Sequence, residues 1–466
     1  MDVLDLTRLQ FAVVTIYHYF FVPLSISLAG TAAGLQIAWL RTGRDTYRDL
    51  TKFVGKLLIV TFAVGVVTGL VQEFQFGMGW SAFARFYGDV FGPTLAIEGM
   101  LAFFLEATFL ALWYFGWDRL PRKLHAATIV VVAVGTVLSA FIILAANSFM
   151  QNPVAYALDP ETGRAHLTDF GDLLLNKVNL AAFPHTLSGA VMIGGALLLA
   201  IGAWRLRAGA EAAFGTLARL GAWLMLAGGA LTAITGDRLG KVITQVQPMK
   251  MAAAEALYAT TTGAPFSVFA IGSPDGSGKP FFSIEVPGLL SILAKGAPGD
   301  TVQGIDNLQA QYAAQYGPGS YVPMSPVAFW TFRLMIGAGM LAMAVALAYL
   351  WFTRRGRDLA DAPRPVRWLA RFLPLIPLLP AAANTLGWIF TETARQPWLA
   401  FGLTKVADGI SPGLTRGEVL VSLLGFAAVY GVIAVVWLRL IRHLSRQPLA
   451  PPPLEVSSPD DLATVY

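Results

Sequence analysis

Cysteine is absent from this 466-residue sequence, and charged residues are scarce. Without a thiol the chain cannot form disulfides, carry out thiolate catalysis, bind iron–sulfur clusters or attach a c-type haem covalently. A metal bound by side chains must therefore be held by histidine, methionine or carboxylates. Only 13% of the residues are charged, against about 25% in soluble domains, so the composition is not that of a soluble protein.

The sequence contains several long runs of apolar residues. Hydrophobic residues make up 56% of the chain, and runs of about 20 apolar residues are typical of membrane-spanning helices. The pattern predicts an all-α membrane protein with about nine transmembrane helices, near residues 11–40, 53–74, 93–117, 126–149, 179–204, 214–236, 326–352, 367–391 and 416–441. The first run follows two acidic residues and is too long for a signal peptide, so we expect it to remain as a span.

Arg and Lys alternate between the two sides of the predicted spans. Basic clusters follow the first, third, fifth, seventh and ninth spans, and the positive-inside rule assigns such connections to the cytoplasm. This places the N-terminus outside and the C-terminus in the cytoplasm. The expected organisation is helices one to six over 1–236, a long outside loop over 237–325, helices seven to nine over 326–445, and a disordered cytoplasmic tail over 446–466. The net charge of +5 belongs to these connections, so nucleic acid is not expected as a partner.

Ionisable and metal-ligating side chains inside the spans mark the candidate site, because such groups are costly in a membrane. On the predicted topology they gather near the outer face: His18, Glu98, Glu106, His185, Arg333, Met335, Glu392 and Arg395. In a regular helix Glu106 lies about 12 Å deeper than Glu98, on roughly the same face. Histidine and methionine suit haem iron, arginine pairs with propionates, and carboxylates in series carry protons. The set indicates a multi-haem redox site.

Each of these residues also has a simpler interpretation. An intramembrane histidine can be a hydrogen-bonded contact between helices, Met335 can pack in the core, and an arginine near a membrane end can extend toward the interface. Three of the five histidines, namely His125, His166 and His443, fall in predicted loops or at helix ends. We expect those three to be solvated.

Two other classes of function remain open on these residues. A secondary transporter or channel would use Glu98 and Glu106 as a proton or cation relay and would contain no haem. It would also be expected to show paired, interrupted half-helices, and no internal repeat is visible. A structural membrane subunit without a cofactor is disfavoured by the number of ionisable residues inside the spans.

Several longer segments carry a resemblance to a known family. They are RLQFAVVTIYHYFFVPL, TKFVGKL, GLVQEFQFG, LAIEGMLAFFLEATF, FGWDRL, NSFMQNP, FPHTLSG, GDRLGKVITQVQPMKMAAAEA, FRLM and GWIFTETARQPW. In order and spacing they resemble subunit I of the cytochrome bd-type quinol oxidases over nearly the full chain. The resemblance implies an electrogenic quinol:O2 oxidoreductase of the bacterial plasma membrane. Such an enzyme oxidises quinol at the outer face and reduces O2 to water with cytoplasmic protons, without pumping.

The resemblance also implies ligands for three haems. His185 and Met335 match the axial ligands of a low-spin haem b, and Arg333 matches an arginine beside it. His18 and Glu392 match ligands within a pair of high-spin haems, a second haem b and a haem d that a further haem b can replace. We expect His18 on haem d and Glu392 on the second haem b.

Further roles follow from the same resemblance. Glu98 matches an acid at the high-spin site, and Glu106 matches a carboxylate on the proton route. Trp388 matches an aromatic residue between the haems, which would otherwise be taken for an interfacial aromatic. Arg8 and Arg395 match contacts to haem propionates.

Lys250 and Glu255 match quinol-binding residues of the family. Without the resemblance they would be interpreted as a solvated loop pair, because residues five apart do not share a helix face. The chain departs from the family at Ala394, where glycine is usual, and its outside loop is of the shorter kind. Expected partners are a second large membrane subunit, small single-helix subunits, quinol, O2 and lipid.

Overall fold

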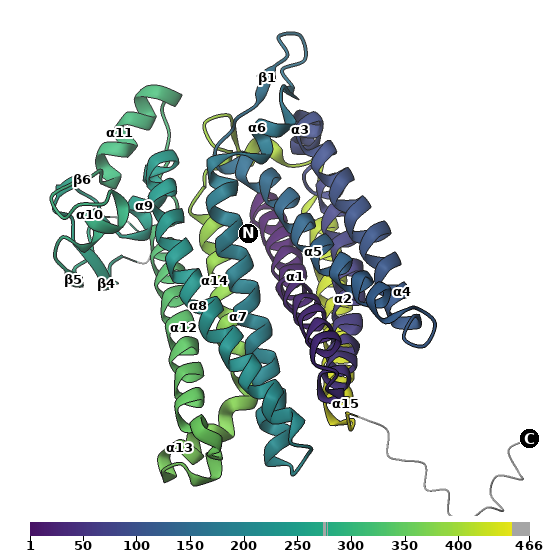
Figure 1. Cartoon of the computed structure of the whole chain (residues 1–466). Helices are drawn as coiled ribbons and strands as arrows, with labels where there is room; N and C mark the ends of the chain where they lie inside the picture. Colours follow the sequence, from purple (N-terminus) through teal and green to yellow (C-terminus); the bar gives the residue numbers. More distant parts are fainter. Residues whose placement is uncertain (274–275, 277, 450–466) are drawn as a thin grey trace, which may run out of the picture.

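The computed structural model describes residues 1–273, 276 and 278–449, with only the backbone described at residues 102 and 103. Long helices run side by side through most of it (Figure 1). They are α1 (Val3–Thr42), α2 (Asp45–Met78), α3 (Ser81–Gly99), α4 (Ala107–Phe115), α5 (Arg122–Gln151), α7 (Lys177–Arg207), α8 (Ala213–Val246), α12 (Ser325–Phe352), α14 (Leu378–Thr393) and α15 (Arg416–Arg446). Among the described residues, eight helices can cross a membrane, or nine if one bent pair is a single span. The predicted all-α membrane fold is confirmed.

Two of the predicted spans are not regular helices. The third is continuous from Ser81 to Phe115, but it contains a π-helical stretch, Met100–Glu106, between α3 and α4. The eighth is a helix pair, Arg364–Leu375 and Leu378–Thr393, bent by 53°. Its first part consists of α13 (Arg364–Leu369) and a 3-10 turn, Ala370–Leu375. Prolines at 374 and 377 account for the break, because proline removes a backbone donor.

Some helix boundaries in the structure differ from the predicted span boundaries. α1 starts at Val3, and α8 continues past residue 236 to Val246, so that the long connection to α12 is shorter than the predicted 237–325. Of the predicted disordered tail over 446–466, residues 450–466 lie outside the described residues. The preceding residues complete α15 and its end.

α7 and α8 are in very close contact, and two glycines permit it. A Cβ atom at Gly195 would lie 2.7 Å from the carbonyl oxygen of Gly221, and one at Gly221 would lie 2.6 Å from that of Gly195. Both distances are too short for a side chain, so only glycine allows the two backbones to meet here. Most of the apolar stretch of α7 is consequently buried inside the bundle.

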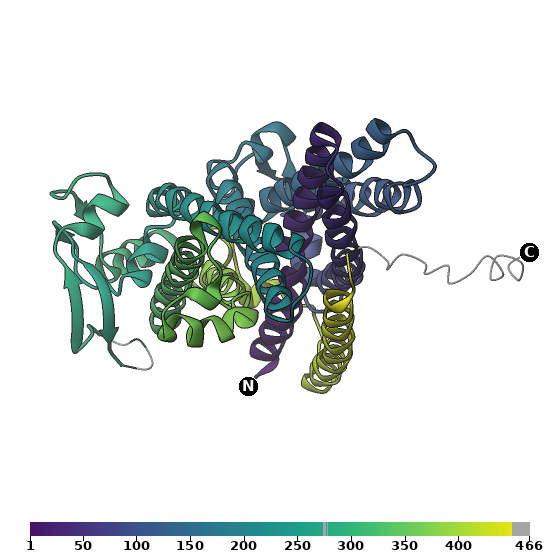
Figure 2. The same ribbon diagram turned by 60° about the horizontal axis from the view of Figure 1, so that its bottom comes forward.

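The connection between α8 and α12 has its own secondary structure. It contains α9 (Pro248–Ala254), α10 (Leu289–Ala294), α11 (Ile305–Tyr316) and the short strands β3 (Thr261–Thr262), β4 (Phe266–Ile271), β5 (Phe282–Val286) and β6 (Thr301–Val302). β4 pairs antiparallel with β5, and β3 with β6. Both views show this part beside α8 and α12 and away from α15 (Figures 1 and 2).

Two smaller connections also carry secondary structure. Between α5 and α7 lie an antiparallel pair, β1 (Tyr156–Leu158) and β2 (Ala165–Leu167), and α6 (Phe170–Leu174). After α14 come the paired strands β7 (Trp398–Ala400) and β8 (Thr404–Lys405) and the 3-10 turn Val406–Gly409. Two further 3-10 turns, Arg354–Gly356 and Leu359–Asp361, follow α12.

Candidate functional site

His185 lies near the start of α7, with its ring fixed by α8. Its Nδ1 is 3.0 Å from the carbonyl oxygen of Thr232. A carbonyl oxygen only accepts hydrogen bonds, so Nδ1 carries the proton and the lone pair of Nε2 is left free. This is the tautomer in which a histidine binds a metal, with its other nitrogen oriented by a backbone acceptor.

His18 on α1 is held in the same way by α2. Its Nδ1 is 3.0 Å from the hydroxyl oxygen of Thr68. That hydroxyl donates its own proton to a carbonyl oxygen in the preceding turn of α2, at Val64 or Gly65. Thr68 must therefore accept from Nδ1–H, which again leaves Nε2 of His18 free.

A glycine lies against each of these two rings. A Cβ atom at Gly69 would be 3.1 Å from Cε1 of His18, and one at Gly236 would be 3.1 Å from Cε1 of His185. Both values are tighter than ordinary van der Waals contact. Each ring thus has its own polar partner and its own glycine on the neighbouring helix: α2 for His18 and α8 for His185.

α14 carries two predicted site residues, Trp388 and Glu392, and packs against a third, Met335 of α12. A Cβ atom at Gly387 would lie 2.8 Å from Sδ of Met335, so glycine leaves space for the thioether. The ring of Trp388 stacks on Tyr19, the neighbour of His18, with 5.2 Å between ring centres. Glu392 lies one turn further along. α14 therefore links α1, which carries His18, with α12, which carries Met335.

Arg333 forms a buried ion pair with Glu255. Its Nη2 is 2.5 Å from Oε2 of Glu255, and its Nε donates to the carbonyl oxygen of Ser267. The guanidinium group is enclosed by the rings of Phe266, Phe329 and Phe332, at 4.2, 4.7 and 5.3 Å. Removal of either partner would leave a buried charge, so the pair fixes α9 against α12.

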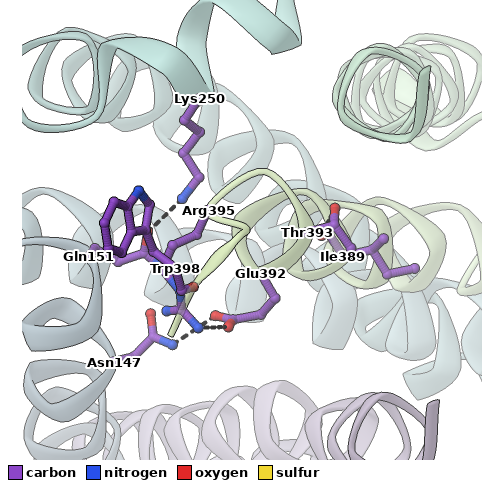
Figure 3. A network of polar contacts seen from close by, with 8 residues as sticks. All are labelled: Asn147, Gln151, Lys250, Ile389, Glu392, Thr393, Arg395 and Trp398. Atoms are coloured by element: carbon purple, nitrogen blue, oxygen red, sulfur yellow. Dashed lines mark hydrogen bonds and ion pairs between the residues drawn. The ribbon is translucent and has the colours of Figure 1, made fainter. Parts of the chain in front are cut away.

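A second polar cluster joins α5, α9 and α14 (Figure 3). Nζ of Lys250 donates to Oε1 of Gln151 at 2.6 Å. Glu392 accepts from Nη2 of Arg395 at 2.6 Å and from Nδ2 of Asn147 at 2.8 Å. Lys250 lies within electrostatic reach of both Arg395 and Glu392.

The interpretation of Lys250 and Glu255 as a solvated pair, which the spacing alone favoured, is wrong. They are 2% and 4% exposed, because α9 docks between α5 and α12 and buries both of its ends. Burial lowers the pKa of Lys250 to about 7, and the charge of Arg395 acts in the same direction, against that of Glu392. Burial raises the pKa of Glu255 to about 7, against the opposing effect of Arg333. In both groups burial thus disfavours the charged form.

The two acids of the third span differ in their surroundings. Glu98 accepts a hydrogen bond of 3.1 Å from the Ser139 hydroxyl on α5. Glu106 is 4% exposed, its Oε1 has no hydrogen-bond partner within the described residues, and it packs against Gly135. The π-helical stretch Met100–Glu106 lies between the two acids, so the premise of a regular helix, on which the predicted offset from Glu98 was based, does not hold. π-helical turns inside α-helices occur frequently at functional sites.

His125 contradicts the prediction that it is solvated. It is 2% exposed, and its Nε2 donates to the carbonyl oxygen of Trp113 at 2.7 Å. Its Nδ1 accepts from Nε2 of Gln36 at 2.7 Å, because the oxygen of that amide accepts from the indole N–H of Trp113 at 2.6 Å. Every polar atom of this network is used within the protein. His166 and His443 are exposed, as predicted.

Arg8 is placed apart from these clusters. It lies near the start of α1, 3.7 Å from Asp5. Ala394, at which the resemblance led us to expect glycine, is buried and has φ of −77°, a conformation open to any residue. The added methyl group packs in a cluster with Ala253 and Ala254 of α9.

The clusters contain donors that suit the edge of a haem. Nη1 of Arg333, Nη1 of Arg395 and Nε1 of Trp388 are buried without a hydrogen-bond partner within the described residues. A buried N–H without an acceptor costs about 1–3 kcal/mol, and a propionate carboxylate would satisfy it. Together with the free Nε2 atoms of His18 and His185, these donors fit haem groups.

Several residues of the site were not predicted. They are Thr68, Thr232, Asn147, Gln151 and Ser139, which orient or pair with the predicted residues. Four of them are polar side chains inside apolar helices, and that property was the available signal. Thr232 acts through its backbone carbonyl, for which the sequence holds no signal.

Comparisons with known proteins agree over nearly the whole chain. A family model described as cytochrome bd terminal oxidase subunit I matches residues 6–449. Cytochrome bd ubiquinol oxidase subunit 1 of Bacillus subtilis (strain 168) is 41% identical, over 93% of this chain and 91% of that protein. Cytochrome bd-II ubiquinol oxidase subunit 1 of Escherichia coli (strain K12) is 34% identical, over 98% and 99%. The bd oxidase structure from Geobacillus thermodenitrificans gives a TM-score of 0.85 at 26% identity, covering 96% of this chain and 98% of that one.

Proposed function

Because the chain belongs to the family of cytochrome bd terminal oxidase subunit I, we propose that it oxidises quinol at the outer membrane face and reduces O2 to water. The chain is a multi-pass protein of the bacterial plasma membrane and a respiratory oxidase subunit, and its family implies haem cofactors and a second subunit. In this proposal the second subunit is the large membrane partner, with small single-helix subunits in addition.

Four residues are assigned as haem ligands. His185 and Met335 hold a low-spin haem b, His18 holds haem d or a further haem b, and Glu392 holds a second, high-spin haem b. When bound, these groups supply one-electron transfer and an open iron position for O2. The free Nε2 of each histidine supports its assignment.

Arginines and a tryptophan bind the edges of these groups. Arg333, Arg395 and Trp388 each keep one buried N–H without an acceptor among the residues that the structure describes. Arg8 is assigned to a propionate as well, on the resemblance alone. These donors orient the cofactors and balance the propionate charge.

Quinol binding is assigned to the α9 region. Lys250 and Glu255 lie at the two ends of this short helix, each in a different cluster. A quinol gives up two protons as it is oxidised, and groups with a pKa near 7 are suited to accept them. Both residues therefore bind quinol and receive its protons.

Transfer of the protons that O2 reduction consumes is assigned to Glu106 and Glu98. Protons are taken from the cytoplasm and released outside, which separates charge without a pump. Glu106, a buried carboxyl whose Oε1 has no hydrogen-bond partner in the described part of the chain, is suited to hold a proton on its way to Glu98. Replacing Glu106 with Gln should lower O2 consumption strongly and leave haem content near normal. Loss of all haem in that variant would instead show a structural role.

The proposal rests on Nε2 of His18 and of His185, which has no hydrogen-bond partner among the residues that the structure describes, and a visible spectrum tests it. Membranes containing this chain and its partner subunit are reduced with dithionite, and the oxidised spectrum is subtracted. We expect haem b bands with a far-red haem d band, or haem b bands alone if haem b replaces haem d. His185→Ala should remove the low-spin haem b signal selectively. A folded complex without any haem signal would overturn the oxidase and favour the transporter.

A further inference from the structure

The connection between α12 and α14, residues 353–377, is rich in exposed arginine. It carries Arg354, Arg355, Arg357, Arg364, Arg367 and Arg371, all exposed, and only two acidic residues. Those two, Asp358 and Asp361, accept hydrogen bonds from backbone N–H groups in a capping box. Within the described part of the chain, none of the six arginines forms an ion pair. Their charge is therefore not neutralised by the protein.

Large apolar side chains are exposed beside the arginines. Trp368, Phe372 and Leu375 are 56%, 50% and 57% exposed, and they follow one another at helical spacing. Leu373 and Ile376 are buried against α7, α8 and α12. The segment 364–375 thus has a buried face, an exposed apolar face, and a face with Arg364, Arg367 and Arg371, which are also spaced three to four residues apart.

This segment is fixed at the end of the helix bundle. Nη1 of Arg207 on α7 donates to the carbonyl oxygen of Ala370 at 3.3 Å, and Nη2 of Arg219 on α8 donates to that of Thr353 at 2.6 Å. The segment turns away from α14 by 53°. Figure 1 shows α13 beyond the end of α12 and at the opposite end of the bundle from α11. The helix pair 364–375 and 378–393 is long and apolar enough for a span only as a whole, and its bend leaves the first half, with its exposed arginines, beyond the end of α12. Charged side chains are costly in the hydrocarbon core, so we place this half in the membrane interface.

We propose that residues 364–375 form a binding surface for anionic phospholipids. Arg364, Arg367 and Arg371 bind the headgroup phosphates, and Trp368, Phe372 and Leu375 insert among the acyl chains. A guanidinium group binds a phosphate through two parallel hydrogen bonds. Exposed aromatic and aliphatic residues next to a basic face are the arrangement found in helices that lie in the membrane interface.

Charge decides between lipid and protein as the occupant. Arg367 donates a hydrogen bond of 3.3 Å to the carbonyl oxygen of Ala360, but no arginine of this surface forms an ion pair within the described residues. A protein that covered the surface would have to supply acidic groups to these arginines and an apolar patch beside them. An anionic lipid supplies both in one molecule and is present wherever the segment meets the membrane. The surface goes beyond the proposed oxidase chemistry, since none of its residues is assigned to haem, quinol or protons.

The test uses the whole oxidase complex reconstituted in membranes. Spin-labelled phosphatidylglycerol and spin-labelled phosphatidylcholine are compared by electron spin resonance, as the fraction of each lipid that is immobilised at the protein. We expect a preference for phosphatidylglycerol. This preference should fall at least about fivefold in the triple variant R364Q/R367Q/R371Q, because the variant loses the attraction of three arginines for anionic lipid.

The control is a second triple variant that removes the same charge from the same end of the bundle. R41Q/R44Q/R442Q changes exposed arginines of α1, α15 and the first connection, which lack the adjacent aromatic face. This variant should keep the preference. In the unmodified complex, 1 M salt should remove most of it, because the Debye length falls to about 3 Å.

Three results would overturn the proposal. The first is an equal affinity for both lipids in the unmodified complex, which is expected if a partner subunit covers the surface. The second is an equal loss of preference in both triple variants. The third is a preference that does not change with salt. O2 consumption is measured in parallel. An inactive complex that keeps its lipid preference would leave this surface intact and count only against the proposed oxidase.

Discussion

The molecule holds the histidines of its helix bundle in two different ways. His18 and His185 each donate from Nδ1 to a neighbouring helix and leave Nε2 free. His125 uses both nitrogens, one toward Trp113 and one toward Gln36. It lies in the first turn of α5, whose other end, at Gln151, contacts Lys250. The histidine with both ring nitrogens bonded therefore lies at the end of α5 that is remote from the Lys250 cluster.

The difference teaches that burial alone does not identify a metal ligand. A histidine can bind iron only if a lone pair is available, and the number of hydrogen bonds to its ring decides that. The network at His125 has no spare acceptor for a further proton or metal. It joins α1, α4 and α5, and its role is structural.

The largest expected effect separates His18 from His125. His18→Ala should remove one haem group from the purified complex, because its iron loses a protein ligand. His125→Ala should leave the haem content unchanged in the protein that folds. Total haem is measured by the pyridine haemochrome method and compared with protein content. Loss of haem in both variants, or in neither, would remove the distinction.

The next effect tests the partner of His18. Thr68→Val keeps the shape of the side chain and removes the oxygen that accepts from Nδ1. Loss of such a supporting hydrogen bond typically lowers metal-site affinity by 10–100-fold. Transfer of haem to apomyoglobin measures the affinity. Unchanged retention would show that Thr68 does not orient the ring.

A smaller effect is expected on the stability of the His125 network. Gln36→Leu leaves the Trp113 indole N–H and Nδ1 of His125 without partners, at a cost of about 1–3 kcal/mol for each group. The midpoint of thermal unfolding should fall by several degrees while the haem spectrum stays unchanged. Gln447→Leu is the matched control, since it breaks only exposed hydrogen bonds and should change stability by less than about 0.5 kcal/mol.

The smallest effect concerns the glycine against the His185 ring. Gly236→Ala puts a methyl group 3.1 Å from Cε1, so the ring must move by a few tenths of an ångström. We expect the low-spin haem to remain, with a shifted absorption band. Gly34→Ala, which meets no atom within 4 Å, should leave the spectrum unchanged. A shift of equal size in both variants would mean that the close contact has no special effect.

The sequence predicted the transmembrane helices and the iron-ligand candidates because both depend on local chemistry. A run of apolar residues is visible in order along the chain, and an ionisable group inside such a run stands out. His125 was misjudged because it lies at the edge of a predicted span and its partners come from α1 and α4. Lys250 and Glu255 were misjudged without the family resemblance because their burial comes from the docking of α9.

The π-helical stretch before Glu106 has no equivalent signal. Its residues are apolar and suit an α-helix equally well, so the change in hydrogen bonding depends on packing against α5. The fold was thus predictable and the candidate ligands were visible in the sequence, whereas the hydrogen-bond partners and the π-helical stretch required the tertiary structure.

The contact between Gly195 and Gly221 has a consequence at a distance. The acceptor for His185 is a carbonyl of α8, so the direction of the imidazole depends on how far α8 is rotated about its axis relative to α7. The two glycines fix that rotation about 15 Å away along α7. The alignment of the Nε2 lone pair is therefore set by two residues that carry no functional group at all.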